Sequence, residues 1–254
     1  MTGLARRALA EFLGTTLLLI AVVGSGIAAQ RLSPHDAGLQ LLENSTATAA
    51  ALVAIILALG PVSGAHLNPV VTLADRIFGG LTSGQAAAYI AAQLLGGAAG
   101  TIVANAMFSL PPVTFSTTVR SSPGLWLGEL VATFGLLLVI FGLVRSGRAS
   151  LAPLAVGAYI GAAYWFTSST SFANPAATLA RTLTDSSTGA FLTAELIGAA
   201  LAVPAIAVLY PAISERAADV VVPHETGRHV EEWSRDYLGL SSNLAGQRLE
   251  VRVG

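Results

Sequence analysis

Six apolar stretches, most of them long enough to cross a lipid bilayer, dominate this chain of 254 residues. They run over about residues 8–28, 46–61, 86–108, 125–144, 151–167 and 188–210. A membrane-spanning helix needs about 20 mainly apolar residues. The second and fifth stretches are short, and segments rich in Gly, Pro and Ser follow both. The pattern predicts an all-α membrane protein with six transmembrane helices.

The charged residues are few and unevenly placed. They make up 11% of the chain, and 54% of the chain is hydrophobic, whereas a soluble domain has about 25% charged residues. Seven of the 14 acidic residues lie between Ala212 and Gly254. We therefore expect a membrane body over residues 1–211 and a polar cytoplasmic tail over residues 212–254.

Composition also excludes several classes of chemistry. The chain has no cysteine, which rules out disulfides, thiol catalysis and thiolate metal ligands. A net charge of −1 gives no electrostatic case for nucleic-acid binding. The membrane body has no catalytic triad, phosphate-binding loop or metal-ligand spacing, so we expect no enzyme activity, no cofactor and no metal.

Arginine placement predicts the orientation in the membrane, because basic residues gather on the cytoplasmic side. Six arginines are expected on one side: Arg6, Arg7, Arg76, Arg145, Arg148 and Arg216. Three are expected on the other: Arg31, Arg120 and Arg181. Both termini are thus predicted to be cytoplasmic, in the cell inner (plasma) membrane. The first stretch alone would also fit a signal peptide, but its counterpart in mid-chain favours a transmembrane helix.

The chain repeats a pattern in two parts, over about residues 5–108 and 125–210. Each part has a glutamate near the start of its first apolar stretch, a Ser-containing loop ending in Asn-Pro, and a polar residue in its last stretch. These residues are Glu11, Asn68-Pro69 and Gln93, and then Glu129, Asn174-Pro175 and Glu195. Three spans per part is an odd number, so the second part must enter the membrane from the opposite side. Such an inverted repeat places its functional site near the membrane midplane.

Each Asn-Pro pair predicts the start of a half-helix. Asn is a preferred N-cap and Pro is favoured at the first helical position. The segments that follow, about 68–78 and 174–183, are too short to cross a bilayer, so they are expected to re-enter the protein. Opposed helix N-termini with Asn amide groups would orient neutral polar solutes and repel cations. The predicted pore centre comprises Asn68, Pro69, Val70, Asn174, Pro175 and Ala176.

The loop at residues 63–72, which contains AHLNPVVT, resembles the major intrinsic protein family of aquaporins and glycerol facilitators. The contexts of Glu11 and Glu129 and the second Asn-Pro-Ala support this resemblance, which covers about residues 5–210. It implies an aquaporin-like fold of six spans and two half-helices, one pore per subunit and a homotetramer in the lipid bilayer. It also implies that Glu11 and Glu129 lie inside the bundle and hold loop carbonyls.

Two departures from the family concern the solute. Val70 stands where the family usually has Ala, and Ala177 stands where it usually has Arg. Arg181 follows one helical turn later, where it either reaches the pore mouth or anchors the membrane interface; we favour the anchor. Counting back from each Asn without gaps gives a predicted selectivity filter of four small residues: Thr48, Ala162, Ser171 and Ala177. Tyr164, Trp165 and Phe172 either refill part of this space or face lipid.

A wide and uncharged outer gate suits larger neutral solutes. The sequence therefore predicts a passive channel for glycerol, urea or arsenous acid, and for water, that excludes ions and protons. A water-selective aquaporin is the first alternative. The second is an inverted-repeat secondary transporter in which Glu11, Glu129 or Glu195 titrates.

Five further residues stand near the pore loops or in the tail. His66 either lines the inner vestibule or serves as a structural hydrogen-bonding group. Asp75 and Arg76 follow the first half-helix and are expected at a solvated helix end. The tail histidines, His224 and His229, are expected on a solvated face rather than at a metal site.

Overall fold

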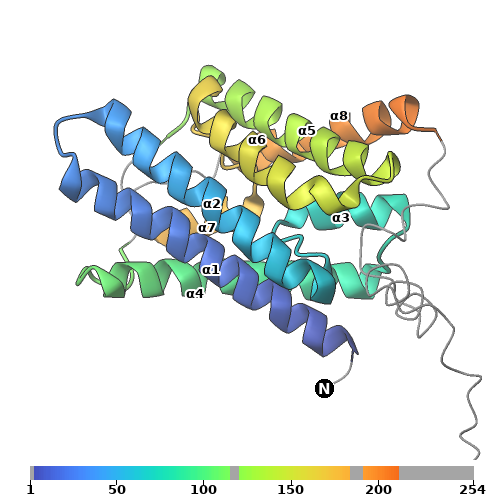
Figure 1. Cartoon of the computed structure of the whole chain (residues 1–254), viewed down its shortest axis with the longest axis horizontal. Helices are drawn as coiled ribbons and strands as arrows, with labels where there is room; N and C mark the ends of the chain where they lie inside the picture. Colours follow the sequence, from blue (N-terminus) through green and yellow to red (C-terminus); the bar gives the residue numbers. More distant parts are fainter. Residues whose placement is uncertain (1–2, 115–119, 184–190, 212–254) are drawn as a thin grey trace, which may run out of the picture. The chain divides into compact units, whose positions relative to one another are not determined.

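The computed structural model describes residues 3–114, 120–183 and 191–211, and these residues form helices joined by loops (Figure 1). The helices long and apolar enough to span a bilayer are α1 (Gly3–Leu32), α2 (Ala37–Ser63), α4 (Ser83–Met107), α5 (Pro123–Arg145), α6 (Ala152–Phe166) with the preceding turn η1 (Ala149–Leu151), and α8 (Phe191–Leu209). The shorter helices are α3 (Pro69–Phe78) and α7 (Pro175–Ala180), the latter continued by η2 (Arg181–Leu183). The predicted fold of six spans and two half-helices is confirmed. The predicted tail, 212–254, lies outside the described residues.

The second transmembrane helix is longer than its apolar stretch. α2 begins at Ala37 because Asp36 caps it, with the Asp36 carboxylate accepting a hydrogen bond from the Leu39 N–H at 2.9 Å. Gln40, Glu43, Asn44 and Ser45 interrupt the apolar residues of its first turns, so the apolar pattern begins later than the helix does. The helix ends before Gly64, which adopts the left-handed conformation (φ 86°) that glycine tolerates.

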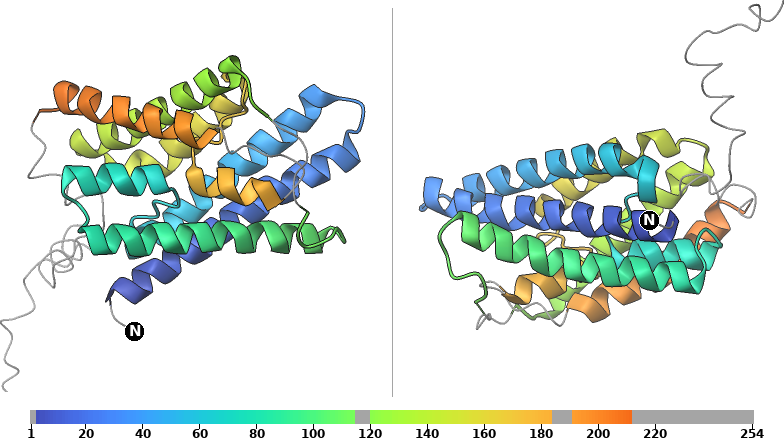
Figure 2. Two further views of the ribbon diagram at one scale, coloured as in Figure 1. Left: turned by 180° about the vertical axis from the view of Figure 1, so that it is seen from behind. Right: turned by 90° about the horizontal axis from the view of Figure 1, so that it is seen from below.

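The two halves of the chain pack in the same way. α1 lies against α2 and α4, α5 lies against α6 and α8, and α2 meets α6 where the halves join. The half-helices α3 and α7 lie between these two sets of helices (Figure 2) and contact each other. The structure thus has the arrangement of an inverted repeat, with the helix starts of the two halves near its middle.

Equivalent glycines allow close helix crossings in both halves. A Cβ atom at Gly96 of α4 would lie 2.4 Å from the Phe12 carbonyl oxygen of α1. A Cβ atom at Gly198 of α8 would lie 2.6 Å from the Leu130 carbonyl oxygen of α5. Phe12 and Leu130 directly follow the two repeat glutamates, so both halves cross at the same place. Small residues at such crossings let membrane helices approach closely.

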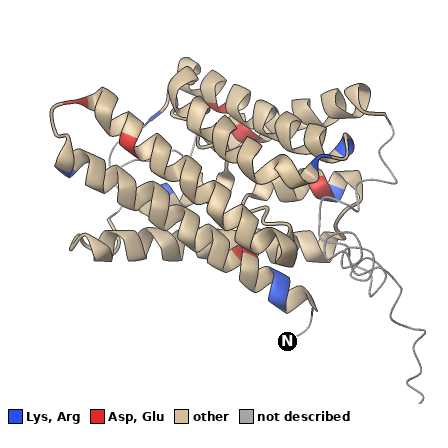
Figure 3. Cartoon of the chain, viewed as in Figure 1, with Lys and Arg blue, Asp and Glu red and all other residues tan. Residues whose placement is uncertain are grey.

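The outward faces of the spans are apolar. Leu9, Leu13 and Leu17 of α1 are exposed, as are Leu154 and Trp165 of α6. Charged residues are sparse along the described helices (Figure 3). Exposed apolar side chains on helices of this length suit contact with lipid, and they leave the polar groups described below for the interior.

Candidate functional site

Both Asn-Pro pairs begin a half-helix. The Asn68 Oδ1 atom accepts a hydrogen bond from the Val70 N–H at 3.0 Å, and α3 starts at Pro69. The Asn174 Oδ1 atom accepts from the Ala176 N–H at 3.0 Å, and α7 starts at Pro175. The predicted caps are therefore confirmed at both helix starts.

The two asparagines also join the two halves. The Asn68 Nδ2 atom donates to the Ala173 carbonyl oxygen at 2.7 Å, and the Asn174 Nδ2 atom donates to the Leu67 carbonyl oxygen at 2.9 Å. Each side-chain amide has two N–H groups, so each asparagine uses one for the opposite loop and keeps a second. The expectation that the Asn amide groups orient solutes therefore applies to one N–H of each asparagine, because the other bonds the opposite loop.

Hydrogen bonds to the Glu11 carboxylate hold the first re-entrant loop, residues 64–67, in its conformation. Ala65 (φ 46°) and Leu67 (φ 52°) adopt the left-handed conformation that non-glycine residues rarely adopt. Such a loop turns successive N–H groups to one side, where they can bind an anion. The Glu11 Oε1 atom accepts from the His66 N–H at 3.0 Å, and its Oε2 atom accepts from the Leu67 N–H at 2.7 Å. Ser63 Oγ and Gln93 Nε2 complete the set at 2.7 and 2.8 Å.

The second re-entrant loop, residues 167–173, repeats this arrangement with Glu129. The Oε1 and Oε2 atoms of Glu129 accept hydrogen bonds from the N–H groups of Phe172 and Ala173 at 2.9 and 2.7 Å. Glu195 accepts from the Asn174 N–H at 3.0 Å and from the Thr178 hydroxyl at 2.6 Å. The side chains of Glu11, Glu129 and Glu195 have no exposed surface.

The glutamates hold the loops through amide groups and not through carbonyls, which corrects the expectation from the family resemblance. The carboxylate oxygens accept hydrogen bonds from the loop N–H groups, so the N–H side of each loop faces its glutamate. In a trans peptide the C=O points opposite to the N–H. The carbonyl oxygens that precede the bound N–H groups, those of Ala65, His66, Ser171 and Phe172, therefore point away from the glutamates.

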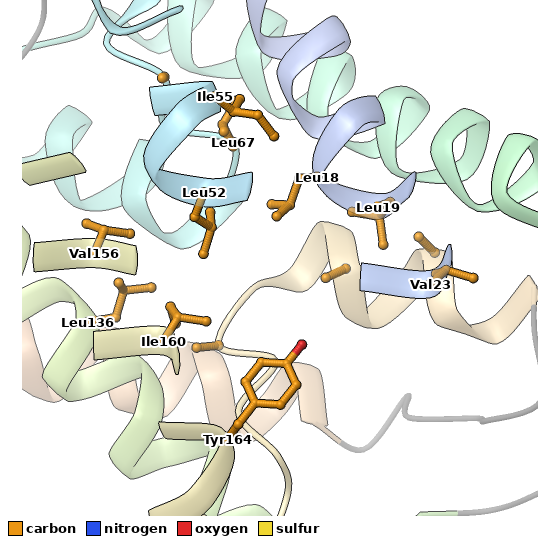
Figure 4. Close-up of a cluster of buried hydrophobic side chains, with 14 of the residues drawn as sticks. Leu18, Leu19, Val23, Leu52, Ile55, Leu67, Leu136, Val156, Ile160 and Tyr164 are labelled. Carbon is orange, nitrogen blue, oxygen red and sulfur yellow. The ribbon is translucent and has the colours of Figure 1, made fainter. Parts of the chain in front are cut away.

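Apolar side chains from four spans face the re-entrant loops (Figure 4). They are Leu18, Leu52, Ile55, Leu136, Val156, Ile160 and Tyr164, and they form one buried cluster with Leu67, Ala173 and Ala177. The re-entrant loops thus lie beside an apolar wall that four spans contribute.

Three of the four predicted filter residues are buried near the second loop or this wall. Thr48 is 2% exposed, Ser171 is 3% exposed and Ala177 is 8% exposed. The Thr48 hydroxyl lies 3.1 Å from the Tyr164 hydroxyl, within hydrogen-bond distance. The structure therefore adds a tyrosine to the group that the sequence predicted to be entirely small.

The structure does not bring Ala162 together with the other predicted filter residues. Ala162 is exposed and belongs to the outer stripe of α6 with Leu154 and Trp165. Two residues later the helix has turned by about 200°, so Tyr164 faces inward where Ala162 faces outward. Counting without gaps from Asn174 missed this register. The spacing of Val156, Ile160 and Tyr164 (i, i+4, i+8) marks the buried face of α6 and could have corrected it.

The remaining aromatic residues take different places. Trp165 is 52% exposed, although its Nε1 atom donates to Ser45 Oγ at 3.2 Å. Phe172 is half-buried in the second re-entrant loop, and the Arg181 guanidinium lies 5.5 Å from its ring centroid. Arg181 also interacts electrostatically with Tyr164. Arg181 therefore lies beside the second loop, on the side expected to face away from the cytoplasm.

The His66 side chain lies in a buried cluster of polar side chains next to the first re-entrant loop. Its Nδ1 atom is 3.1 Å from Thr72 Oγ1, and its Nε2 atom is 4.0 Å from Asp75 Oδ2. Its ring packs edge-on against Tyr89 at 5.5 Å. The prediction of a solvated Asp75 is wrong because Asp75 has no exposed surface, whereas Arg76 is exposed as predicted. Among the described residues, no group of three or more His, Asp or Glu is placed to hold a metal ion.

The sequence model of the family described as "Major intrinsic protein" matches residues 2–205 of this chain. The chain belongs to the major intrinsic protein family. It is 50% identical over 206 residues to the aquaglyceroporin AqpS of Rhizobium meliloti (strain 1021), which covers 78% of this chain and 88% of that protein. It is 35% identical over 166 residues to a probable TIP-type aquaporin of Medicago truncatula, covering 61% of this chain and 64% of that protein.

A solved structure agrees with the fold of this major intrinsic protein. The X-ray structure of the aquaglyceroporin from Plasmodium falciparum matches it with a TM-score of 0.61 and 23% sequence identity, covering 86% of this chain and 100% of the other. At this identity the match concerns the fold alone. The family and the six spans together make the chain a multi-pass membrane protein.

The two departures from the usual family pattern occupy buried positions. Val70 has no exposed surface, and its backbone N–H bonds to the Asn68 cap, so the extra bulk leaves the start of α3 intact. Ala177 lies next to the Asn174 cap, with its N–H at 3.4 Å from Asn174 Oδ1. The positive charge near the second loop comes from other positions, which include Arg181.

Proposed function

We propose that this protein is a passive transmembrane channel for small uncharged solutes such as glycerol, urea and arsenous acid, and for water, and that it excludes ions and protons. The observation that carries this function is the meeting of two capped half-helix starts, joined by reciprocal bonds from Asn68 and Asn174. The aquaglyceroporin that is 50% identical to this chain supports the same class of solute.

The chemistry of the two sides of the site suits neutral polyols. A solute passing the centre must replace the hydrogen bonds that it made to water. Loop carbonyls accept bonds from its hydroxyl groups, and the second N–H of each asparagine donates to its oxygens. The apolar wall around Leu52 and Ile160 contacts its carbon side. A solute that both donates and accepts on one side and is apolar on the other fits this arrangement.

The same centre opposes cations. Each helix N-terminus carries about half a positive charge, and the starts of α3 and α7 face the same region. A cation that loses its water shell there meets positive dipole ends in place of compensating anions. The carboxylates of Glu11 and Glu129 do not relieve this, because they bond the N–H side of the loops. A neutral solute carries no such cost.

The outer gate in this proposal consists of Thr48, Tyr164, Ser171 and Ala177, with Arg181 beside it. Tyr164 makes the gate narrower than four small residues would make it, and its ring offers an apolar surface. Its hydroxyl is engaged with Thr48 at 3.1 Å. We place this gate on the side away from the cytoplasm, with both termini cytoplasmic, in the cell inner membrane as a homotetramer.

Purified protein in liposomes tests the function. Stopped-flow light scattering should record permeability above that of empty liposomes for glycerol, urea, arsenous acid and water. The variant Asn68→Ala/Asn174→Ala is the matched control, because it removes both caps and both cross-bonds, and its solute flux should fall to the empty-liposome level. No flux of any solute through the wild-type protein would contradict the channel.

The same measurement separates the alternatives. Water flux without solute flux would favour a water-selective aquaporin. Solute flux that saturates and follows a pH gradient would favour a secondary transporter. The hydrogen-bonding of Glu11 by four donors, at 2.7 to 3.0 Å, favours a structural role for this carboxylate over that of a titrating carrier.

A further inference from the structure

The two re-entrant loops differ in the group that binds one equivalent carbonyl. In the first half, the Ser63 carbonyl oxygen accepts from the neutral Tyr89 hydroxyl at 2.9 Å. In the second half, the Ser169 carbonyl oxygen accepts from Arg120 Nη2 at 3.0 Å. The repeat thus places a guanidinium directly on the second loop, where the first loop has a phenol.

Arg120 comes from the segment just before α5 and packs on the same aromatic ring as Arg181. Its guanidinium carbon lies 5.7 Å from the ring centroid of Phe172 and 5.8 Å from that of Phe191. The Arg181 guanidinium lies 5.5 Å from the Phe172 ring. Phe172 belongs to the second re-entrant loop, so both cations lie beside that loop. We call Arg120 and Arg181 the outer arginine pair.

The Arg120 charge is held close to the loop. The side chain is half-buried, and among the described residues no carboxylate lies within ion-pair distance of it. Glu129 attracts it from farther away, but both Glu129 oxygens accept hydrogen bonds from loop N–H groups. An arginine stays protonated at neutral pH. Arg120 therefore contributes a fixed positive charge at the outer side of the second loop.

We propose that the outer arginine pair, and Arg120 in particular, is the outer barrier to cations in this channel, hydronium included. The inference deepens the proposed function and rests on it. Charge near a narrow, weakly hydrated passage acts strongly on a passing ion and hardly at all on a neutral solute. Arg120 is accordingly a residue that sets charge selectivity, and its hydrogen bond to Ser169 keeps the charge in place.

Three substitutions at Arg120 separate charge from structure. Arg120→Gln keeps an N–H donor for the Ser169 carbonyl but removes the charge. Arg120→Lys keeps the charge with a different shape, and Arg120→Met removes both. The matched control is Arg31→Gln, because Arg31 has the same chemistry away from both re-entrant loops. It donates to the Phe108 carbonyl oxygen at 2.7 Å and lies 5.2 Å from the Phe108 ring centroid.

The experiment measures proton and glycerol flux in the same proteoliposomes, with a trapped pH-sensitive dye and an imposed potassium diffusion potential. The wild-type protein should conduct glycerol and stay tight to protons. Arg120→Gln should raise proton permeability about tenfold, with glycerol flux changed less than twofold. Arg120→Lys and Arg31→Gln should stay as tight as the wild type, and Arg120→Gln/Arg181→Gln should leak more than Arg120→Gln alone.

Several results would overturn the inference while leaving the channel intact. They are an Arg120→Gln protein as tight to protons as the wild type, an Arg120→Lys protein as leaky as Arg120→Gln, and an equal leak in Arg31→Gln. Loss of glycerol flux in Arg120→Gln together with a lower melting temperature would make Arg120 a structural residue only. Absence of solute flux in the wild-type protein would instead overturn the proposed function itself.

Discussion

At the scale of single residues, the position of one tyrosine decides how wide the proposed outer gate is. Tyr164 is 7% exposed, belongs to the inward cluster and pairs with Thr48. Ala162, two residues earlier, faces outward. The two side chains therefore give opposite expectations for substitution, although they lie on the same turn of α6.

Removing the Tyr164 ring should widen the gate. We expect Tyr164→Ala to raise the flux of a five-carbon polyol at least about threefold relative to glycerol, because the lost ring leaves space that the neighbours only partly fill. Tyr164→Phe, which keeps the ring and loses only the bond to Thr48, should change this ratio much less. Light scattering of proteoliposomes under polyol gradients measures both.

Ala162→Leu is the control for the register of α6. An added side chain on the outward stripe should leave every solute flux unchanged. A strong loss of glycerol flux in Ala162→Leu, with no effect of Tyr164→Ala, would restore the gap-free register and contradict the structure.

The burial of Asp75 illustrates what single residues cannot reveal in a sequence. Its position near the end of a half-helix predicts that its side chain is exposed to solvent. In the structure the chain turns back over it, and a Cβ atom at Gly80 would lie 2.2 Å from Asp75 Oδ1. This contact depends on the loop after α3 and on His66, and no local pattern encodes either.

At the scale of helices, local signals predicted starts well and registers poorly. The starts of α3 and α7 were predicted to the residue, since an Asn cap and a following Pro act within one turn. The start of α2 was missed because polar residues in its first turns interrupt the apolar pattern. The contacts of α6 with α2 depend on packing between spans, and counting from a distant motif cannot supply them.

The crossing of α4 over α1 yields an element-scale prediction. Gly96→Ala should lower the stability of the purified protein by about 1–3 kcal/mol, because the new Cβ atom would lie 2.4 Å from the Phe12 carbonyl oxygen, which is backbone and cannot move aside. The displaced Phe12 is next to Glu11, so glycerol flux should fall as well. Thermal unfolding in detergent and light scattering measure the two effects.

Gly84→Ala is the matched control in the same helix. A Cβ atom there meets nothing within 4 Å, and alanine favours a helix over glycine by about 1 kcal/mol. Its melting temperature should equal or exceed that of the wild type. If Gly96→Ala were equally well tolerated, the close crossing of α1 and α4 would be wrong.

At the scale of the whole described body, one kind of contact holds each half together and another kind joins the two halves. Each repeat glutamate fixes the loop of its own half. Each pore asparagine caps its own half-helix and bonds the loop of the other half. The sequence predicted that the two helix starts meet, because an inverted repeat brings them together. It did not predict the cross-bonds, which need the left-handed loop conformations that aim the Leu67 and Ala173 carbonyls.

This division predicts different couplings for two pairs of substitutions. Asn68→Ala and Asn174→Ala belong to one hydrogen-bonded centre, so their effects on stability should not add, with an interaction energy of about 0.5–3 kcal/mol. Glu11→Gln and Glu129→Gln share no hydrogen-bond partner, and their effects should add within about 0.5 kcal/mol. Melting temperatures of the four single and two double variants in one detergent give both cycles. Additive asparagines, or glutamates coupled as strongly as the asparagines, would mean that the halves are joined elsewhere than at the two cross-bonds.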